Sequence, residues 1–586
     1  MDDNLPPTGN VALHLARMAA EHPEQVAIHA PLQRVATHGS TPHRAITFRE
    51  LNADVDAIAH GLTAAAITRG TRVAMMVPPS PDFFALTFAL LKVGAIPVMI
   101  DPGMGLTNLG RCLAEAEPEA FMGIAPAHLA RRLLGWGHKT LRTTVNVGSW
   151  RFFCHFSLAE LRRQGHNRGP FPMATCRDDE PAAILFTSGS TGVAKGVVYT
   201  HGIFAAQVEM LKQTYGIVPG EVDLCTFPLF ALFGPALGMT CVIPDMNPSR
   251  PARLNPHQAA AQLRQFGVTN LFGSPAVIRR LGELTDPAPF ARLKRVISAG
   301  AAASPAALER LAQLLPDGVE IFTPYGATEA LPVTNIGSRV ILGETRTCTE
   351  QGAGVCVGRP VGGVEVRVIR ICDEAIAEWD DALLVPPGQI GELVVRGPIV
   401  TREYYHRPEA TARAKIRDPQ TGTVLHRMGD VGYIDEQGRL WFCGRKSHRV
   451  VTPAGTLFTD QVEPIFNTVP GVSRTALVGV TRAGVTYPVV CVECHDRANR
   501  PRSQHRLWVS ELLRVRLPAL ARQFERTRQI TTFLHYPGSF PVDVRHNAKI
   551  FREKLAVWAD RQLGPRWQPS TPAEVTTGPA EVTTGV

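Results

Sequence analysis

The sequence predicts an α/β protein with two parts. The first is a large N-terminal domain with parallel-type sheets, crossover helices and a β-rich subdomain, and the second is a small mobile α+β C-terminal domain. From about residue 45 to 340, short apolar runs alternate with helix-length segments, a pattern typical of parallel strands joined by crossover helices. After about Gly352 the strands become short and are separated by turn signals. A chain of 586 residues also exceeds one compact core.

Composition excludes several classes of protein. With 45% hydrophobic and 19% charged residues the chain is too apolar to be disordered, and its eleven cysteines lack the regular spacing of a disulfide scaffold. The net charge is +9, but the basic residues are spread along the chain, which favours a compositional bias over a nucleic-acid surface. Only nine of the 61 basic residues are lysines, so a lysine at a motif position is a stronger indication of function than an arginine would be. The start, MDDNLPPTGN, has no apolar run, so we expect a cytoplasmic protein without a transmembrane segment.

The expected strands follow one another in a regular order. In the large domain they are Val73 to Val77, Ile96 to Ile100, Ala182 to Phe186, Asn270 to Phe272, Arg295 to Ser298 and Glu320 to Thr323, followed by Glu365 to Ile371 and Gly391 to Val395. The apolar stretch Phe83 to Ile100 divides into a helix and a strand. Val489 to Cys494 forms part of a later strand, an interpretation that we prefer to a haem attachment at the Cys-x-x-Cys-His sequence there.

One uncharged stretch, Leu224 to Pro244, is long enough to span a membrane. Its prolines and glycines break such a span, so it predicts a buried wall around an apolar ligand, and peripheral membrane contact remains open. Its aromatic residues are candidates for a substrate pocket: Phe227, Phe230 and Phe233.

Changes in composition and in the pattern of expected strands predict domain boundaries. The expected units are a lead-in at 1–44, the large domain at 45–444, a hinge at 445–447, a small domain at 448–565 and a disordered tail at 566–586, where PAEVTTG occurs twice.

The sharpest local signal is a strand that runs into a loop of glycines and hydroxyl residues. The loop residues are Thr187, Ser188, Gly189, Ser190, Thr191 and Gly192, and Lys195 follows. Unpaired backbone N–H groups and hydroxyls can surround phosphate oxygens there, while Lys195 adds positive charge. The loop is not a Walker A motif, because Ala194 and Gly196 flank the lysine.

This segment resembles the phosphate loop of the adenylate-forming superfamily, which includes acyl- and aryl-CoA synthetases, peptide-synthetase adenylation domains and luciferases. TSGSTGVAKG differs from the family pattern by Ala194 in place of proline. Further motifs recur in the family's order across residues 45 to 560. The resemblance implies an enzyme that uses ATP and Mg²⁺ to convert a carboxylate into an acyl-AMP.

The resemblance also implies roles for residues in the later motifs. Gly300, Ala301 and Ala302 resemble the adenine-binding segment. The next motif is Tyr325-Gly326-Ala327-Thr328-Glu329. The resemblance implies that Tyr325 stacks on adenine, that Thr328 contacts the α-phosphate and that Glu329 binds Mg²⁺. A carboxylate suits the last role because Mg²⁺ prefers hard oxygen ligands.

The last motifs lie near the expected hinge and near the C-terminus. Asp430 resembles the acceptor of the ribose hydroxyls, and Arg445 resembles the arginine before the hinge, where Ser447 replaces the usual Asp or Lys. Lys549 and Arg552 match the final Lys-x-x-Arg pattern, in which the lysine stabilises charge as the carboxylate attacks.

Three stretches that contain these motifs and the residues beside them are most similar to the β-lactone synthetases of bacterial long-chain olefin biosynthesis: 325–333, 444–450 and 542–550. That resemblance implies adenylation of a 2-alkyl-3-hydroxy fatty acid, followed by attack of its 3-hydroxyl to give a β-lactone. It also implies possible association with thiolase-like, reductase and decarboxylase enzymes. The alternatives are a long-chain fatty-acyl-CoA ligase or acyl-AMP ligase, and an inactive adenylate-binding assembly protein.

Overall fold

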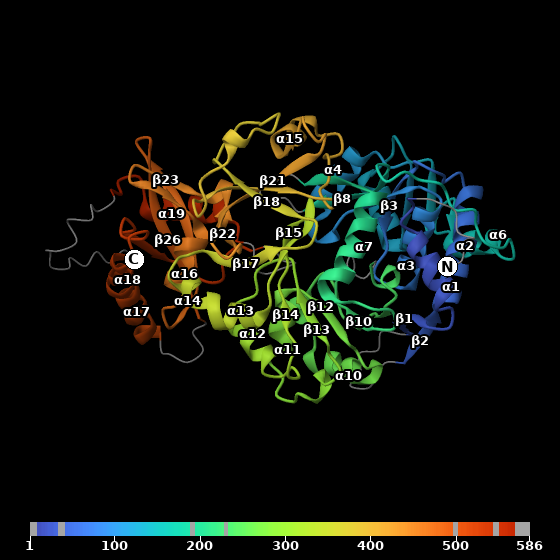
Figure 1. Cartoon of the computed structure of the whole chain (residues 1–586), viewed down its shortest axis with the longest axis horizontal. Coiled ribbons are helices and arrows are strands. Elements are labelled where there is room, and N and C mark those ends of the chain that lie inside the picture. Colours follow the sequence, from blue (N-terminus) through green and yellow to red (C-terminus); the bar gives the residue numbers. More distant parts are fainter. Residues whose placement is uncertain are drawn as a thin grey trace.

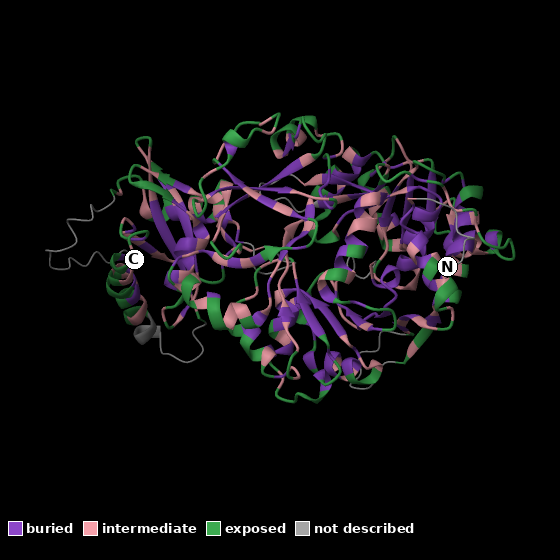
Figure 2. Cartoon of the chain, in the orientation of Figure 1, coloured by how far each residue is buried: buried purple, intermediate pink, exposed green. Residues whose placement is uncertain are grey.

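The computed structural model describes residues 9–32, 42–187, 194–227, 233–495, 502–542 and 550–568. The chain has the predicted mixed α/β architecture: three large sheets form the main body, and a smaller unit near the C-terminus lies at one end of the long axis (Figure 1). Most strands of the large sheets are buried along much of their length (Figure 2).

Two seven-stranded sheets form the first half of the main body. The first has the order β14 (Ile321–Phe322), β13 (Arg295–Ser298), β12 (Asn270–Gly273), β10 (Val222–Cys225), β11 (Thr240–Val242), β1 (Val26–Pro31) and β2 (His43–Thr47). The second has the order β7 (Phe156–Ser157), β6 (Thr143–Asn146), β5 (Ala120–Gly123), β3 (Arg72–Met76), β4 (Ile96–Met99), β8 (Pro181–Thr187) and β9 (Lys195–Thr200). Only the last pair of each sheet, β1/β2 and β8/β9, is antiparallel.

Helices pack between and around these two sheets. They are α1 (Leu13–Glu21), α2 (Phe48–Ala64), α3 (Pro81–Lys92), α4 (Leu106–Ala116), α5 (Ala125–Leu134), α6 (Leu158–Gly165), α7 (His201–Tyr215), α9 (Phe233–Ala236), α10 (Pro256–Phe266), α11 (Pro275–Leu281) and α12 (Pro305–Ala312). The largest core joins residues of α1, α2, α3 and α7 to strands of both sheets, so these helices hold the two sheets together.

Local sequence signals explain where the central helices begin. A capping box starts α2: the Thr47 side chain accepts from the Glu50 backbone N–H while Glu50 accepts from that of Thr47. Ser80 caps α3, which ends at Lys92 and is followed by β4, so the predicted division of Phe83 to Ile100 is confirmed.

The uncharged stretch 224–244 does not form one helix. Its described residues form parts of β10, α9 and β11 and the segments next to them, and most of them are buried. Within the described part of the chain, no helix has the length and apolar character needed to cross a membrane.

The third sheet forms the predicted β-rich subdomain. Its order is β15 (Tyr325–Ala327), β16 (Ala330–Asn335), β17 (Val355–Pro360), β22 (Leu440–Arg445), β21 (Val424–Ile434), β19 (Gly391–Arg396) and β18 (Glu365–Ile369), and β20 (Lys415–Arg417) pairs with β21. All of these pairs are antiparallel. Short helices accompany them: α13 (Ser338–Val340), α14 (Arg346–Glu350) and α15 (Pro408–Ala414).

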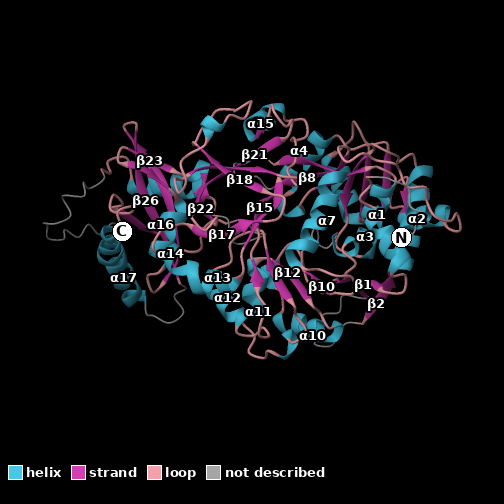
Figure 3. Cartoon of the chain, viewed as in Figure 1, coloured by secondary structure: helices cyan, strands magenta, loops and turns pink. Residues whose placement is uncertain are grey.

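A small α+β unit follows, with its strands and helices at the C-terminal end of the molecule (Figure 3). It contains the hairpin β23 (Val450–Thr452) and β24 (Gly455–Leu457), the sheet of β25 (Val472–Arg482), β26 (Val485–Cys494) and β27 (Thr532–His535), and the helices α16 (Thr459–Asn467), α17 (Arg502–Glu511), α18 (Leu517–Gln523) and α19 (Arg552–Leu563). Cys491 is buried within β26, as the strand interpretation of this segment predicts.

The expected lead-in at 1–44 is wrong for residues 9–32. Strand β1 pairs in parallel with β11, and Leu15 and Ile28 are 1% and 0% exposed in the main core. Sequence patterning missed this because the partner of β1 lies some two hundred residues further along the chain, and a local pattern does not reveal so distant a pairing.

A buried ion pair inside this core generates a stability prediction. The Lys92 Nζ lies 2.5 Å from Asp56 Oδ1, and their side chains are only 5% and 8% exposed. Because Asp56→Ala leaves a buried ammonium without its counter-charge, we expect a loss of about 3–5 kcal/mol in the free energy of unfolding, measured by urea denaturation. Arg49→Ala removes the exposed pair with Glu24, whose side chains are 64% and 75% exposed, and should cost at most about 1 kcal/mol. Equal losses for the two variants would contradict this assignment.

Candidate active site

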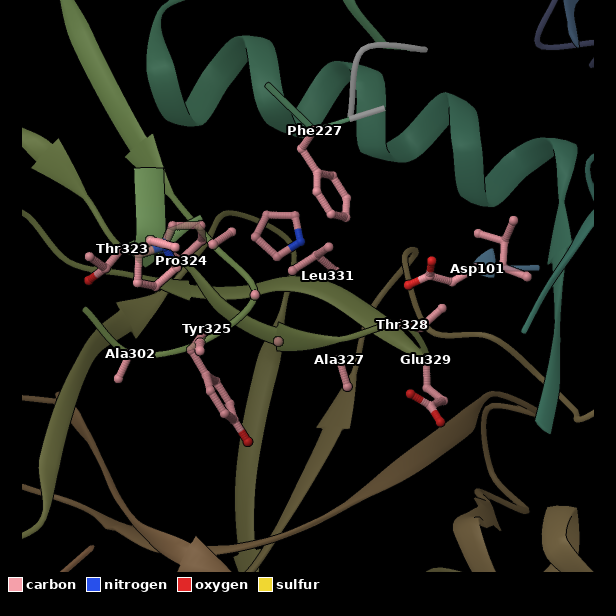
Figure 4. Close-up of a pocket in the computed structure, with 18 of the residues that line it drawn as sticks. Asp101, Phe227, Ala302, Thr323, Pro324, Tyr325, Ala327, Thr328, Glu329 and Leu331 are labelled. Carbon is pink, nitrogen blue, oxygen red and sulfur yellow. The ribbon is translucent and has the colours of Figure 1, made fainter. Parts of the chain in front are cut away.

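The β15–β16 hairpin carries the aromatic-Gly-x-Thr-Glu motif to the edge of a large cavity. Gly326 is required there, because a Cβ at this position would lie 2.6 Å from the Ala330 carbonyl oxygen. Figure 4 shows the Tyr325 and Glu329 side chains pointing to one side of this segment, while Leu331 and Phe227 approach each other on the opposite side. The hairpin therefore separates a polar region of the cavity from an apolar one.

Three motifs distant in sequence meet at the carboxylate of Asp430 on β21. The Tyr325 hydroxyl donates to Asp430 Oδ2 at 2.5 Å, and the Arg445 guanidinium at the end of β22 lies 2.8 Å from Oδ1. Burial raises the pKa of Asp430, whereas Arg445 and the Tyr325 hydrogen bond oppose this rise. The result is a buried carboxylate at the cavity wall, a group suited to accepting hydrogen bonds from a diol.

Tyr404 holds Glu329 in place. Its hydroxyl donates to Glu329 Oε1 at 2.7 Å, and the backbone N–H and hydroxyl of Thr401 both donate to the Glu329 carbonyl oxygen, at 2.9 and 3.0 Å. Within the described ranges, Oε2 of Glu329 has no hydrogen-bond partner. That oxygen is a suitable Mg²⁺ ligand, and no cluster of three or more His, Cys, Asp or Glu that could hold a metal occurs among the described residues. A Mg²⁺ ion would thus depend on Glu329 and on oxygens of the substrate.

Two further residues of the motifs lie near this carboxylate. The Tyr199 hydroxyl donates to the Thr328 carbonyl oxygen at 2.5 Å, which fixes the backbone before Glu329. Lys195 begins β9 directly opposite Thr187, the last residue of β8. Its ammonium lies 4.8 Å from the centre of the Tyr404 ring, so Lys195 and Glu329 contact the same tyrosine. Ser188, Gly189, Ser190, Thr191 and Gly192 lie outside the described residues.

Gly300, Ala301 and Ala302 line the cavity after β13, as does the Tyr325 ring. Gly300 has φ +98°, a conformation that side chains disfavour, and the two alanines leave room for a flat ring to approach the backbone. This arrangement matches the expectation of an adenine-binding wall, which remains a prediction for this chain.

The apolar part of the cavity lies beside α3 and α7. The cavity as a whole has a volume of about 2370 Å³. Its apolar lining includes Phe83, Phe88, Leu91, Met99, Phe204, Val208, Leu211, Phe227 and Phe233. Of the predicted pocket residues, Phe227 contacts Phe272 and Phe233 contacts Phe204, with ring centres 6.0 and 5.9 Å apart, and Phe230 lies outside the described residues. This region can hold long alkyl groups.

The small unit contributes Arg552 to the cavity lining. Its guanidinium pairs with Glu463 of α16 at 2.7 Å, and Glu463 also accepts from the Leu477 backbone N–H at 2.9 Å. Burial raises the pKa of Glu463 to about 7, with Arg552 opposing the rise. Lys549, three residues earlier in the predicted motif, lies outside the described residues.

Sequence reasoning missed Tyr404, Tyr199 and Lys415. The tyrosines had no signal, because neither belongs to a recognisable motif. Lys415 had one, since it is one of only nine lysines. Its buried ammonium donates to Thr401 Oγ1 at 3.1 Å and to the Thr401 carbonyl oxygen, and it lies 5.9 Å from the Tyr404 ring centre. It thus supports both residues that position Glu329.

This fold and this set of side chains define an adenylate-forming enzyme, and the chain belongs to the AMP-binding enzyme family, whose family model matches residues 15–405. The match covers the two parallel-type sheets, the β15–β16 hairpin and the segment that contains Tyr404.

Two relatives match almost the whole chain. The olefin beta-lactone synthetase of Stenotrophomonas maltophilia (strain K279a) is 50% identical over 562 residues, which is 95% of this chain and 99% of the relative. The protein of the same name from Xanthomonas campestris pv. campestris is 49% identical over 558 residues, covering 94% and 98%. Among solved structures, the amide bond synthetase McbA from Marinactinospora thermotolerans has the same fold, with a TM-score of 0.72 at 22% identity over 93% of this chain and 99% of that chain.

The buried lysine generates a pH prediction. Burial lowers the pKa of Lys415 to about 7, below its ordinary value of 10.5. Between these values the unfolded chain binds one proton more than the folded chain, so this lysine makes stability increase as pH rises. We expect the free energy of unfolding to rise between pH 7 and 10 more steeply in wild type than in Lys415→Met, by up to about 1.4 kcal/mol per pH unit. Exposed Lys554→Met should keep the wild-type slope, and a wild-type slope in Lys415→Met would contradict the assignment.

Proposed function

We propose that this protein uses ATP and Mg²⁺ to adenylate a 2-alkyl-3-hydroxy fatty acid, and that the substrate's own 3-hydroxyl then closes a β-lactone. The observation that carries the proposal is the convergence of Tyr325, Asp430, Glu329 and Lys195 on one cavity with a large apolar region. The two relatives named olefin beta-lactone synthetase, about half identical over nearly the full chain, support the choice of acid and product.

The polar region of the cavity suits a bound nucleotide. Asp430 accepts from the ribose hydroxyls, the Tyr325 ring and the Gly300 to Ala302 backbone contact the adenine, and Thr328 contacts the α-phosphate. The loop residues Thr187 to Gly192 and Lys195 are those that the sequence predicts to bind the remaining phosphates. Glu329 would hold Mg²⁺, which when bound would supply positive charge to the phosphates.

The proposed chemistry has two displacements. A carboxylate oxygen of the acid attacks the α-phosphorus, and pyrophosphate leaves. The 3-hydroxyl oxygen then attacks the acyl carbon, loses its proton, and AMP leaves with the carboxylate oxygen that bonded it to the acyl group. Ring closure is assisted because nucleophile and electrophile belong to one molecule whose alkyl groups the Phe227 and Phe233 region confines.

We further propose that residues 448–565 form a mobile domain that pivots at 445–447 and brings Lys549 to the reacting carboxylate. Two basic residues at or beside the proposed pivot contact acidic residues of the main body: Lys446 contacts Glu392 at 3.1 Å, and Arg449 contacts Asp373 at 2.5 Å. Pivoting then exchanges these ion pairs for others. A cytoplasmic location and association with thiolase-like, reductase and decarboxylase enzymes belong to the same proposal.

The bond between Tyr404 and Glu329 makes the role of Mg²⁺ testable. Tyr404→Phe removes the hydroxyl that orients the carboxylate, so we expect the Mg²⁺ concentration for half-maximal pyrophosphate release to rise about tenfold. Tyr405→Phe is the matched control, because Tyr405 is the neighbouring tyrosine, its ring stacks on His406, and the hydrogen bond to Glu329 comes from Tyr404. An unchanged Mg²⁺ requirement in Tyr404→Phe would count against metal binding by Glu329.

The reaction itself is tested by its products. Purified protein is incubated with ATP, Mg²⁺ and a 2-alkyl-3-hydroxy fatty acid, with and without CoA, and products are identified by proton NMR and mass spectrometry. We expect a β-lactone without CoA, and a rate about two to four orders of magnitude lower for Lys549→Ala but not for the nearby Lys554→Ala. A thioester formed only with CoA would identify a fatty-acyl-CoA ligase, and an adenylate released without lactone an acyl-AMP ligase. A lack of any pyrophosphate release would leave an inactive adenylate-binding protein.

A further inference from the structure

Helix α5 exposes the side chains that a surface helix ordinarily buries. Leu129, Leu133 and Leu134 are 51%, 76% and 50% exposed, while the one buried residue of this helix is His128. Surface helices normally turn their leucines toward the core. Packing within the chain therefore does not account for the outer face of α5.

A neighbouring loop adds exposed aromatic rings to this face. Trp150 and Phe153 are 82% and 81% exposed. Phe152 and Phe153 have φ values of +43° and +56°, a left-handed conformation that bulky residues rarely adopt. The Arg132 guanidinium of α5 lies 5.6 Å from the centre of the Phe153 ring, so the loop and the helix form one surface. We call Leu129, Arg132, Leu133, Trp150 and Phe153 the α5 face.

The stretch of sequence that forms the α5 face carries charge of one sign. Residues 120 to 159 contain no Asp or Glu over forty positions. The same stretch contains five basic residues outside the histidines: Arg131, Arg132, Lys139, Arg142 and Arg151. Arg151 pairs with Glu160, which lies just beyond this stretch, at 2.7 Å. An anionic surface is therefore the complementary partner.

We propose that the α5 face docks onto the headgroup region of an anionic lipid bilayer. Exposed leucines with Trp and Phe enter the boundary between headgroups and acyl chains, and arginines next to them bind lipid phosphates. Tryptophan and arginine are favoured at such boundaries because each combines an apolar body with a polar end. This proposal goes beyond the proposed function and does not depend on the product of the reaction.

The inner side of α5 connects this surface to the cavity. Ala127 and Ala130 of the helix, together with Trp136 just after it, line the same cavity as Tyr325 and Glu329. One helix, about 10–12 Å across, thus separates the cavity from the docked bilayer. For a substrate with long alkyl groups, docking places the enzyme where such a molecule is concentrated.

Vesicle flotation tests the proposal with the full-length protein. Large unilamellar vesicles of phosphatidylcholine alone are compared with equimolar phosphatidylcholine and phosphatidylglycerol, at 50 and 500 mM NaCl. We expect binding to the anionic vesicles at low salt and a several-fold loss at high salt. The double variant Leu133→Ser with Phe153→Ser should bind at least tenfold more weakly, and Arg132→Glu about tenfold more weakly on anionic vesicles only.

Matched variants separate docking from general effects. Leu507 is 73% exposed on α17, so Leu507→Ser removes an equally exposed helical leucine elsewhere, and Arg561→Glu reverses an exposed charge on α19. Both should bind vesicles like wild type, and the melting temperatures of all variants should agree with that of wild type. Absent binding of the wild type to anionic vesicles overturns the proposal. So does unchanged vesicle binding in the double variant, and if its mass in sedimentation also changes, the α5 face is a protein interface instead.

Discussion

The buried carboxylate of Asp430 is the constraint on which the site depends. A carboxylate with a side chain only 3% exposed is costly unless it is paired, and here a hydrogen-bond donor comes from β15 and a positive charge comes from the end of β22. Satisfying Asp430 therefore fixes the positions of the Tyr325 ring and of the segment that leads into the small unit. A single electrostatic requirement thus joins the Tyr325 side of the cavity to the expected hinge.

A second set of contacts fixes the position of Glu329. Tyr404 binds its carboxylate, Thr401 binds its carbonyl oxygen, and Lys415 supports both from a buried position. This lysine has no acidic partner within ion-pair distance among the described residues, and the nearby charge of Glu329 favours its protonated form. The position of Glu329 is therefore set by contacts with Tyr404 and Thr401, which Lys415 supports.

Much of this arrangement is predictable from the sequence, for physical reasons. Buried parallel strands are short apolar runs, so most of those expected match the observed strands to within two residues, and the glycine-rich motifs are visible because close backbone approach restricts residue choice, as at Gly326. The pairing of β1 with β11 was not predictable, since it joins distant segments. Neither were Tyr199 and Tyr404, which act through single hydrogen bonds that no local pattern encodes.

In the proposed reaction the substrate carboxylate, and not its hydroxyl, is activated by transfer to AMP. The most direct test of this step uses a 2-alkyl-3-hydroxy fatty acid with both carboxylate oxygens labelled as ¹⁸O, followed by mass spectrometry of AMP and of the lactone. Activation of the carboxylate predicts one ¹⁸O atom in AMP and one in the lactone carbonyl. Both labels retained in the lactone, with unlabelled AMP, would show that the hydroxyl is activated instead and would contradict activation of the carboxylate.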